Sequence, residues 1–417
     1  MADHDFIQRH RIGTQSFTRK RLLPFQTVML FLMNLIKGSL QDELDHFFKA
    51  AQQGTAWVRI VTKSAFCRAR KKLSYLAFTE LNQTLIRSFY LEFPVKTWFG
   101  FNLMAFDGST AQVPATPDNL AHFGDFSTTA DKSCPLARVS QMFDVLNKIT
   151  VDASISPLSV GERDLAVNHL FYLRPTDLVL MDRGYPAFWL FKLILTLGGQ
   201  FCARISPRLW SEVKNFHRSG AKDKVIKLSP TYPAKLKCRE LGLDENPLEL
   251  RLLRIERLEQ PGEVLITSLV EATAYPSDVF DNLYRKRWPI EQDYNLMKNR
   301  LEIEKWSDQS PASVYQDFHA KVLTKNLAAA MVQPVQETIN LEMTGRKYKY
   351  QINFTQVLSK FKDTIVSLFQ TDLLTELIEA LILIFSKTIE PIRPGRKCLR
   401  LKKMLPSNFN PCYKPLR

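Results

Sequence analysis

The sequence predicts an α/β protein in which a mixed β-sheet is flanked by helices, and three observations support this prediction. Apolar residues follow helical spacing before residue 95 and again after residue 313. Short apolar or alternating runs, which are typical of strands, fill much of the segment 99–205. Helical stretches separate these runs, and an alternation of strands with helices indicates a sheet covered by helices.

The first 95 residues predict a helical, basic region. Phe25 to Phe48 is apolar at helical spacing, with a break expected at Gly38. The run 63–73 predicts a basic helix with Ser64 as its N-cap. Four of its cations are candidates for contact with nucleic-acid phosphates, and a solvated surface helix is the alternative. These candidates are Arg68, Arg70, Lys71 and Lys72.

The middle of the chain predicts the sheet. Residues 101–106 predict a strand that ends in a turn at Asp107-Gly108, with residues 111–113 returning beside it. The remaining elements expected in this segment are strands at 139–146 and 149–155, a helix at 162–173, a fully buried strand at 178–181, a helix at 187–197 and a strand at 200–205.

The segment 206–275 is rich in Pro, Lys and Glu and contains short strand-like runs, so it predicts a small β-rich insertion. A helix is expected at about 277–300, and further helices at 313–332 and 354–386. We therefore predict five segments: a helical, basic N-terminal DNA-binding domain at 1–98, the first part of the core at 99–205, the insertion at 206–275, the second part of the core at 276–335, and a helical C-terminal region with a basic tail at 336–417.

Charge and cysteine usage narrow the class of protein. The net charge is +15, with a surplus of eight cations in residues 1–100 and another eight in residues 391–417. Basic ends around a nearly neutral centre indicate a protein that binds a polyanion. The six cysteines show no metal-site spacing, and the chain shows no signal peptide and no apolar run long enough to span a bilayer. We therefore expect a cytoplasmic, nucleoid-associated protein with no membrane partner.

Three carboxylates occupy positions that suit a catalytic metal site. Asp107 and Asp182 each follow a predicted strand, and Glu291 lies on the helix after the insertion. Sites in open α/β sheets form beyond strand ends, so these side chains can converge. Oxygen ligands without His or Cys suit Mg²⁺ or Mn²⁺, and two such ions can promote phosphodiester displacement. Taken singly, each Asp is equally well explained as a turn residue.

The helix around Glu291 carries a charged stripe. Tyr284, Arg287, Glu291 and Lys298 stand at offsets of 0, 3, 7 and 14, which on one helix fall within about 60° of each other. Such a stripe faces either solvent or a charged ligand. Pro289 leaves a second possibility open, because a helix that begins there would place Tyr284 and Arg287 on the approach to it. Trp288 is expected to pack in the core.

These motifs together resemble the IS4-type DDE transposases of bacterial insertion sequences. The matching residues are Asp107-Gly108, Asp182-Arg183-Gly184-Tyr185, and the Tyr-x2-Arg-x3-Glu-x6-Lys pattern formed by Tyr284, Arg287, Glu291 and Lys298. The resemblance covers about residues 100–330 and also touches residues 64–73. It implies a ribonuclease-H-like catalytic core interrupted by a β-rich insertion.

The resemblance also implies a reaction. Family members cut double-stranded DNA at the inverted-repeat ends of an element and join the freed 3′-hydroxyls to a target. Carried onto this sequence, Asp107, Asp182 and Glu291 are catalytic and hold two Mg²⁺ or Mn²⁺ ions. Arg183, Tyr284, Arg287 and Lys298 are expected to bind DNA phosphates, with the protein acting as a homodimer or a larger homo-oligomer.

Three other functions fit the sequence less well. A structure-specific nuclease on the same core would need the carboxylates but not the Tyr, Arg and Lys of the pattern. A non-catalytic, decayed product of an element would not be expected to keep all three carboxylates. A carbohydrate hydrolase with paired carboxylates would leave the basic ends unexplained.

Overall fold

The computed structural model describes the chain except for residues 20, 53–58, 127–133, 258–259, 370–372 and 394–417. The chain forms two compact units, each built from segments that are distant in sequence. The helical unit comprises Met1–Phe93, Ala111–Ala137 and Leu296–Arg417, and the sheet unit comprises Pro94–Thr110 and Arg138–Asn295. The basic tail predicted after Arg393 lies outside the described residues. The five-segment division stays a prediction.

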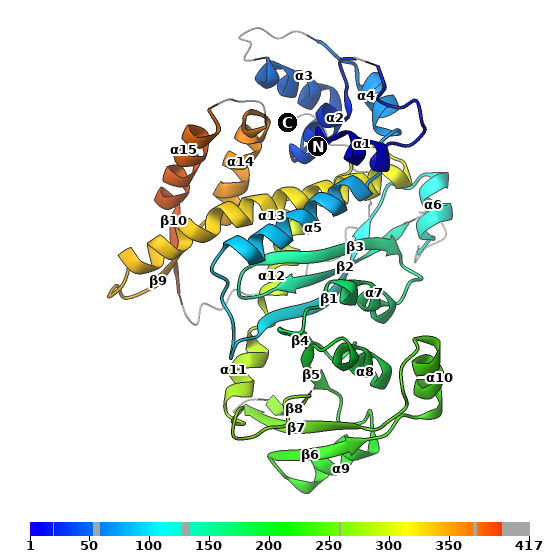
Figure 1. The fold of residues 1–417 in the computed structure, drawn as a ribbon, viewed down its shortest axis with the longest axis vertical. Coiled ribbons are helices and arrows are strands. Elements are labelled where there is room, and N and C mark those ends of the chain that lie inside the picture. Colours follow the sequence, from blue (N-terminus) through cyan, green and yellow to red (C-terminus); the bar gives the residue numbers. More distant parts are fainter. Residues whose placement is uncertain (20, 53–58, 127–133, 258–259, 370–372, 394–417) are drawn as a thin grey trace. The chain divides into compact units, whose positions relative to one another are not determined.

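One eight-stranded sheet organises the sheet unit (Figure 1), in the order β3-β2-β1-β4-β5-β8-β7-β6. Strands β1, β4 and β5 are parallel, whereas β8, β7 and β6 continue the sheet in antiparallel pairs. The strands are β1 (Asn102–Gln112), β2 (Leu136–Asp144), β3 (Ile149–Pro157), β4 (Asp177–Met181), β5 (Gln200–Ile205), β6 (Asp223–Leu228), β7 (Leu248–Arg257) and β8 (Gln260–Thr267). The mixed α/β class is confirmed, with the first five strands of the sheet in the order 3-2-1-4-5.

The centre of the sheet follows from its apolar strands. All five residues of β4 are buried, as expected of a strand with parallel neighbours on both sides and helices over the sheet. Helix α7 (Glu162–His169), extended by a 3-10 turn at Leu170–Tyr172, packs against β3. Helix α8 (Phe188–Thr196) packs against β5, where the rings of Phe191 and Phe201 stack with centroids 4.0 Å apart.

The segment 206–275 is not purely β. It contributes the three antiparallel strands predicted from its short apolar runs, but also α9 (Ser211–Ser219) and α10 (Tyr232–Glu240). Helix α9 packs on β6 and β7, and α10 packs on α8. Its strands widen the core sheet beyond β5, so the segment belongs to the same sheet as the predicted catalytic core.

Two local predictions near the site residues were wrong. The predicted turn at Asp107-Gly108 is absent, and β1 continues through both residues to Gln112. Asp-Gly is a frequent turn pair, but Gly108 has no positive φ here and the chain stays extended. The single helix expected at 277–300 is divided into α11 (Val279–Arg285) and α12 (Pro289–Asn299). The second helix begins at Pro289, since proline supplies no amide to an earlier turn and favours the first helical position.

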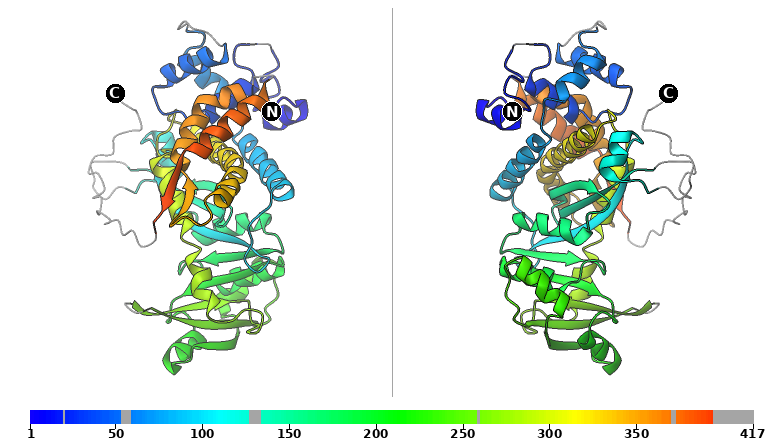
Figure 2. Two further views of the ribbon diagram at one scale, coloured as in Figure 1. Left: turned by 90° about the vertical axis from the view of Figure 1, so that its left-hand side faces the viewer. Right: turned by 90° about the vertical axis from the view of Figure 1, so that its right-hand side faces the viewer.

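The helical unit is assembled around α13 (Pro311–Glu342), which contacts helices from both ends of the chain. Helix α5 (Leu76–Glu92) runs beside α13 in both views of Figure 2. The other helices are α1 (His4–His10), α2 (Phe25–Met33), α3 (Leu40–Ala51), α4 (Lys63–Arg70), α6 (Pro117–Phe123), α14 (Phe354–Leu368) and α15 (Leu374–Lys387). A small antiparallel pair joins β9 (Lys349–Ile352) and β10 (Ile389–Ile392).

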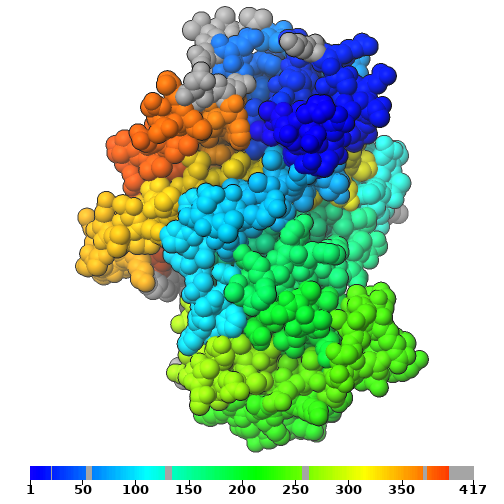
Figure 3. Space-filling view, in the orientation of Figure 1, coloured from blue at the N-terminus to red at the C-terminus, as the bar shows by residue number. Residues whose placement is uncertain are grey.

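Packing within this unit brings α14, from the C-terminal region, against helices of the N-terminal region. Helix α14 contacts α2 and α3, and the orange C-terminal helices lie against the blue N-terminal ones in Figure 3. Helix α4 starts one residue before the predicted cap, because the hydroxyl of Thr62, not Ser64, accepts the amide of Ala65. The helix expected at 354–386 is two helices. Within the described part of the chain, no helix combines the length and the apolarity needed to cross a membrane.

Candidate active site

The parallel pairing of β1 with β4 sets the positions of Asp107 and Asp182. The last paired residues are Ala105 and Leu180. Continued by two residues, the same register aligns Asp107 with Asp182, on strands whose neighbours lie about 4.8 Å apart. Asp107 lies within β1 and Asp182 directly follows β4, and residues aligned on neighbouring parallel strands carry their side chains on the same face. Asp182 is close enough to raise the pKa of Asp107. This is the relationship that two ligands of one site require.

Glu291 is linked to Asp107 through Arg287. A guanidinium nitrogen of Arg287, Nη2, donates to Oε1 of Glu291, while its Nη1 lies 3.8 Å from Oδ2 of Asp107. The hydroxyl of Tyr294 donates to the backbone oxygen of Asp107 over 2.8 Å, and so ties α12 to β1. The break before Pro289 places Arg287 ahead of α12, yet its side chain still reaches the first turn of that helix. The charged face therefore meets the carboxylates of the sheet.

Burial and like charge act together on Asp107. Burial raises the pKa of the Asp107 carboxyl to about 6, and the neighbouring Asp182 and Glu291 raise it too, against Arg287 and the amide of Gly108. One arginine therefore offsets only part of the negative charge gathered here. A further positive charge near these carboxylates would therefore be stabilised.

Asp182 stands apart from the cations. Its Oδ1 accepts the amide of Gly184 at 2.9 Å, and its half-buried carboxylate has no ion-pair partner among the described residues. The amide contact depends on the glycine, because a Cβ at Gly184 would stand 3.2 Å from the same oxygen. The Asp-Arg-Gly-Tyr motif thus orients one carboxylate oxygen and leaves the other open.

Glu162 is a fourth carboxylate at the site and was not singled out from the sequence. It lies in the first turn of α7 and pairs with Arg138 at 2.6 Å. Its side chain covers Gly108, since a Cβ there would meet Cδ and Oε1 at 3.1 Å. Only its position on a predicted helix was visible in the sequence, and nothing local distinguishes it from a solvent-facing Glu in a first turn.

Tyr284 and the residues around it form the second part of the site. The Tyr284 hydroxyl is buried and makes no hydrogen bond to any described residue. Burial raises the pKa of Tyr284 to about 12, opposed by Arg287 and by Arg204, whose guanidinium carbon lies 5.9 Å from the ring centroid. Arg204 also donates to Glu263 at 2.9 Å, and Arg183, which is half exposed, lies 3.8 Å from the same Glu263. Arg204 and Glu263 were not predicted.

The other candidates are more scattered. Lys298 is half-buried in the last turn of α12, on the same helix as Glu291. Trp288 was expected in the core but is 48% exposed, because the chain between α11 and α12 turns it outward. Arg68, Lys71 and Lys72 are exposed on and just after α4. Arg70 is different: it is buried and fully engaged within the helical unit, so we no longer count it among the DNA contacts.

The contacts of Arg70 explain this change. Its guanidinium pairs with Asp317 at 2.8 Å and donates to Gln316 at 2.8 Å and to Ser307 at 2.6 Å. The side chain is 1% exposed. Arg70 therefore fastens α4 to α13 and to the loop before it, which is a structural task.

The comparison with known families agrees with the motif spacing. The profile of the transposase DDE domain family matches residues 98–327, which span β1, β4 and α12. The chain belongs to this family. It is 26% identical over 272 residues to the transposase InsG of insertion sequence element IS4 from Escherichia coli (strain K12). That alignment covers 64% of this chain but only 60% of InsG, less than two thirds of the relative's length.

A solved structure is also similar to the chain. The piggyBac transposase in a synaptic complex with hairpin DNA matches with a TM-score of 0.45 and 10% identity. The match covers 94% of this chain and 82% of the piggyBac chain.

DDE transposases generally use divalent metal ions, and the residues at this site suit them. The available donors are carboxylate oxygens, which Mg²⁺ and Mn²⁺ prefer. An unpaired Asp182 and an incompletely neutralised Asp107 are the surroundings that a cation would stabilise. Among the described residues, no three His, Cys, Asp or Glu side chains are yet close enough to enclose an ion, and Arg287 lies between two of the three candidate ligands.

Proposed function

We propose that this protein is a DNA transposase that cleaves DNA at the inverted-repeat ends of an insertion sequence and joins the 3′-hydroxyls to target DNA. The observation that carries the proposal is the register of β1 and β4, which aligns Asp107 with Asp182, together with the contact of Arg287 with both Asp107 and Glu291. Membership of the transposase DDE domain family supports it.

Asp107, Asp182 and Glu291 would hold two Mg²⁺ or Mn²⁺ ions. When bound, such ions activate the attacking water or 3′-hydroxyl and stabilise the leaving oxygen. The protein's own part is to supply and orient the carboxylates: Gly184 orients Asp182, and Tyr294 holds the backbone at Asp107. Arg287 contacts Asp107 and Glu291 and would turn toward a DNA phosphate when the ions are bound.

Four residues would position the DNA. Tyr284 offers a buried hydroxyl with no described partner, which can donate to a phosphate oxygen. Arg183 is exposed beside Asp182 in sequence, and Lys298 lies two turns beyond Glu291 on α12. With Arg287 they would fix the scissile phosphate. The full reaction pairs two element ends, so we propose that the active form is a homodimer or a larger homo-oligomer on DNA.

The test is a cleavage and strand-transfer assay on duplex DNA that carries the imperfect inverted repeats flanking the gene. Asp107→Asn, Asp182→Asn and Glu291→Gln should each lower cleavage roughly a thousandfold, since a metal's charge stabilisation is worth several kcal/mol. Binding of the same DNA in EDTA should persist. Asp281→Asn is the matched control, because Asp281 lies on α11 and pairs with the exposed Arg285. Cleavage by any of the three variants at the wild-type rate would exclude that carboxylate from the reaction.

A further inference from the structure

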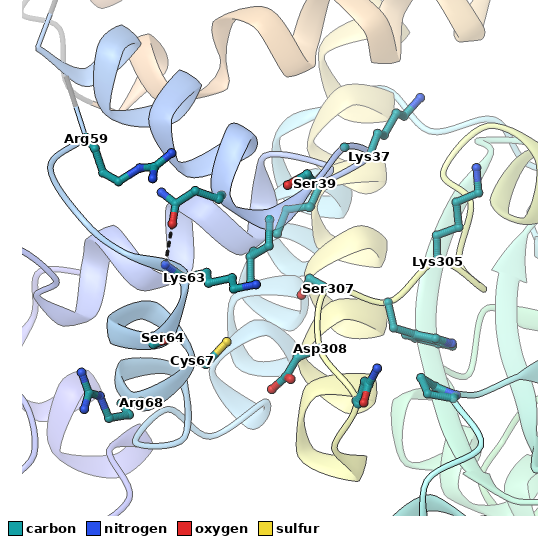
Figure 4. A pocket seen from close by; sticks show the side chains of 17 residues that line it. Lys37, Ser39, Arg59, Lys63, Ser64, Cys67, Arg68, Lys305, Ser307 and Asp308 are labelled. Carbon is teal, nitrogen blue, oxygen red and sulfur yellow. Dashed lines mark hydrogen bonds between the residues drawn. The ribbon is translucent and has the colours of Figure 1, made fainter. Parts of the chain in front are cut away.

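A basic hollow of about 690 Å³ lies within the helical unit, between α3, α4 and the loop that precedes α13. Figure 4 shows its labelled side chains. Cations come from three separate segments: Lys37 precedes α3, Lys63 and Arg68 lie on α4, and Lys305 belongs to the loop. Arg59 adds a fifth, and Asp308 is the only acidic side chain of the lining.

Only part of the positive charge of this hollow is neutralised: Arg59 pairs with Asp45 at 3.1 Å and Lys305 with Glu302 at 3.0 Å. The side chains of Lys63 and Arg68 make no hydrogen bond or ion pair with any residue that the structure describes. Burial lowers the pKa of Lys37, and the nearby cations Lys362, Lys305 and Arg300 lower it further, against an opposing effect of Glu302. Cations that crowd one another in a recess provide a site for an anion.

Hydrogen bonds and an ion pair with other parts of the helical unit hold the segments around the hollow in place. Arg70 joins α4 to Ser307 and Asp317, as described above. Lys321 on α13 donates to the backbone oxygens of Glu302 at 2.9 Å and Lys305 at 2.8 Å. The buried Trp306 donates to the backbone oxygen of Gln112 at 2.8 Å. These contacts fix the segments that carry the cations, so little of the protein has to become ordered when a ligand binds.

A second hollow, of about 1220 Å³, lies along the other side of α4. Arg19, Arg21 and Lys72 line it, and Arg68 borders both hollows. No Asp or Glu belongs to the lining of the second hollow. Helix α4 thus stands between two cationic recesses, while Lys71 on the same helix end borders neither.

We propose that α4 and its two flanking hollows form a binding site for the phosphate backbone of duplex DNA. Duplex DNA carries one negative charge about every 1.7 Å along its axis. Eight cations spread over two recesses match such an extended row of charges better than they match a single small anion. The site rests on the proposed function, in which the chain grips an element end. Lys305 lies six residues after the end of α12 in the sequence.

Binding of a 30-base-pair duplex in EDTA, between about 50 and 200 mM salt, tests the site without cleavage. Lys63→Gln and Arg68→Gln should each weaken binding roughly five- to tenfold and lower the log–log salt slope by about 1. Arg346→Gln is the matched control, because Arg346 is exposed in the turn after α13 and borders neither hollow. It should leave both quantities near the wild-type values. If Arg346→Gln weakens binding as much as the other two variants, diffuse surface charge binds the DNA and the site is excluded.

A second measurement locates the DNA directly. Ser64 is exposed in the lining of the first hollow, so a Ser64→Cys variant places a thiol there for alkylation, mapped by mass spectrometry. Saturating duplex should slow alkylation of this thiol at least tenfold, and should not slow that of an Arg346→Cys variant. Equal protection or no protection at both positions would overturn the proposal. Because neither assay needs catalysis, an inactive enzyme that still passes both would refute only the proposed function.

Discussion

Arg287 reaches from the turn before α12 to Asp107 on β1, with its Nη1 3.8 Å from the Oδ2 of that aspartate. The same guanidinium binds Glu291. Arg287, which is predicted to bind a DNA phosphate, therefore contacts two of the proposed metal ligands. This contact would make Arg287 a competitor of a metal ion for the same carboxylates.

Replacing Arg287 by Gln should strengthen metal binding and weaken strand transfer. Removal of a nearby cation should raise the affinity for Mn²⁺ roughly tenfold, the equivalent of about 1.4 kcal/mol. Isothermal titration with Mn²⁺ and no DNA measures this. Arg285→Gln is the control, because Arg285 is exposed on α11 and pairs with Asp281. Unchanged or weaker Mn²⁺ binding by Arg287→Gln would show that Arg287 does not compete with the metal.

Two glycine substitutions should distinguish the role of Asp182 from that of Glu162. Gly184→Ala would place a Cβ 3.2 Å from Oδ1 of Asp182, while Gly108→Ala would place one 3.1 Å from Glu162. Each must displace its neighbour by a few tenths of an ångström. If Asp182 binds metal, Gly184→Ala should lower cleavage roughly tenfold and should also weaken Mn²⁺ binding. A larger effect of Gly108→Ala would instead bring Glu162 into the catalytic set.

Arg70→Met should destabilise the fold without acting on DNA directly. It leaves the buried Asp317 without its cation, which typically costs about 3–5 kcal/mol. Urea unfolding measures the loss, and the exposed Lys71→Met should change stability by less than about 0.5 kcal/mol. An Arg70→Met protein with unchanged stability but weakened DNA binding would restore Arg70 as a DNA contact.

The ion pair between Glu43 and Lys362 should make the stability of the fold depend on pH in the acidic range. Burial alone would raise the pKa of Glu43, but Lys362 at 2.8 Å and the amides of Lys37 and Gly38 outweigh it and lower the pKa below the ordinary 4.5. A lowered carboxyl pKa stabilises the fold above pH 4.5, and this contribution is lost as the pH falls through the folded-state value.

Glu43→Gln isolates that contribution. At pH 7 the variant should be less stable by about 1–3 kcal/mol, as for a hydrogen-bonded charge. The difference between variant and wild type should shrink as urea unfolding is repeated from pH 5 toward pH 3. A difference that stays constant over this range would mean that the charge of Glu43 does not matter to the fold.

The sequence by itself determined the class of fold, the position of most core strands and the spacing of the candidate site. These features are periodic and local: a strand such as β4 is apolar throughout because both of its faces are covered, and the offsets of Tyr284, Arg287, Glu291 and Lys298 are read directly from the chain. The division of the helix at Pro289 was also open to prediction, since proline acts on its own turn.

Only the tertiary structure decided what the individual charged residues contact. Arg70 looks like its neighbours on a basic helix, yet its ion-pair partner is 247 residues away, and no local pattern reports a partner at that distance. The same holds for Asp107, where Asp-Gly predicts a turn but β1 continues as a strand. The positions of Glu162 and Arg287 also depend on contacts between distant segments. Helix α7 brings Glu162 to the site, and the turn before α12 brings the side chain of Arg287 to Asp107. Local periodicity records which face of an element is buried, whereas the identity of what buries it depends on contacts between distant segments.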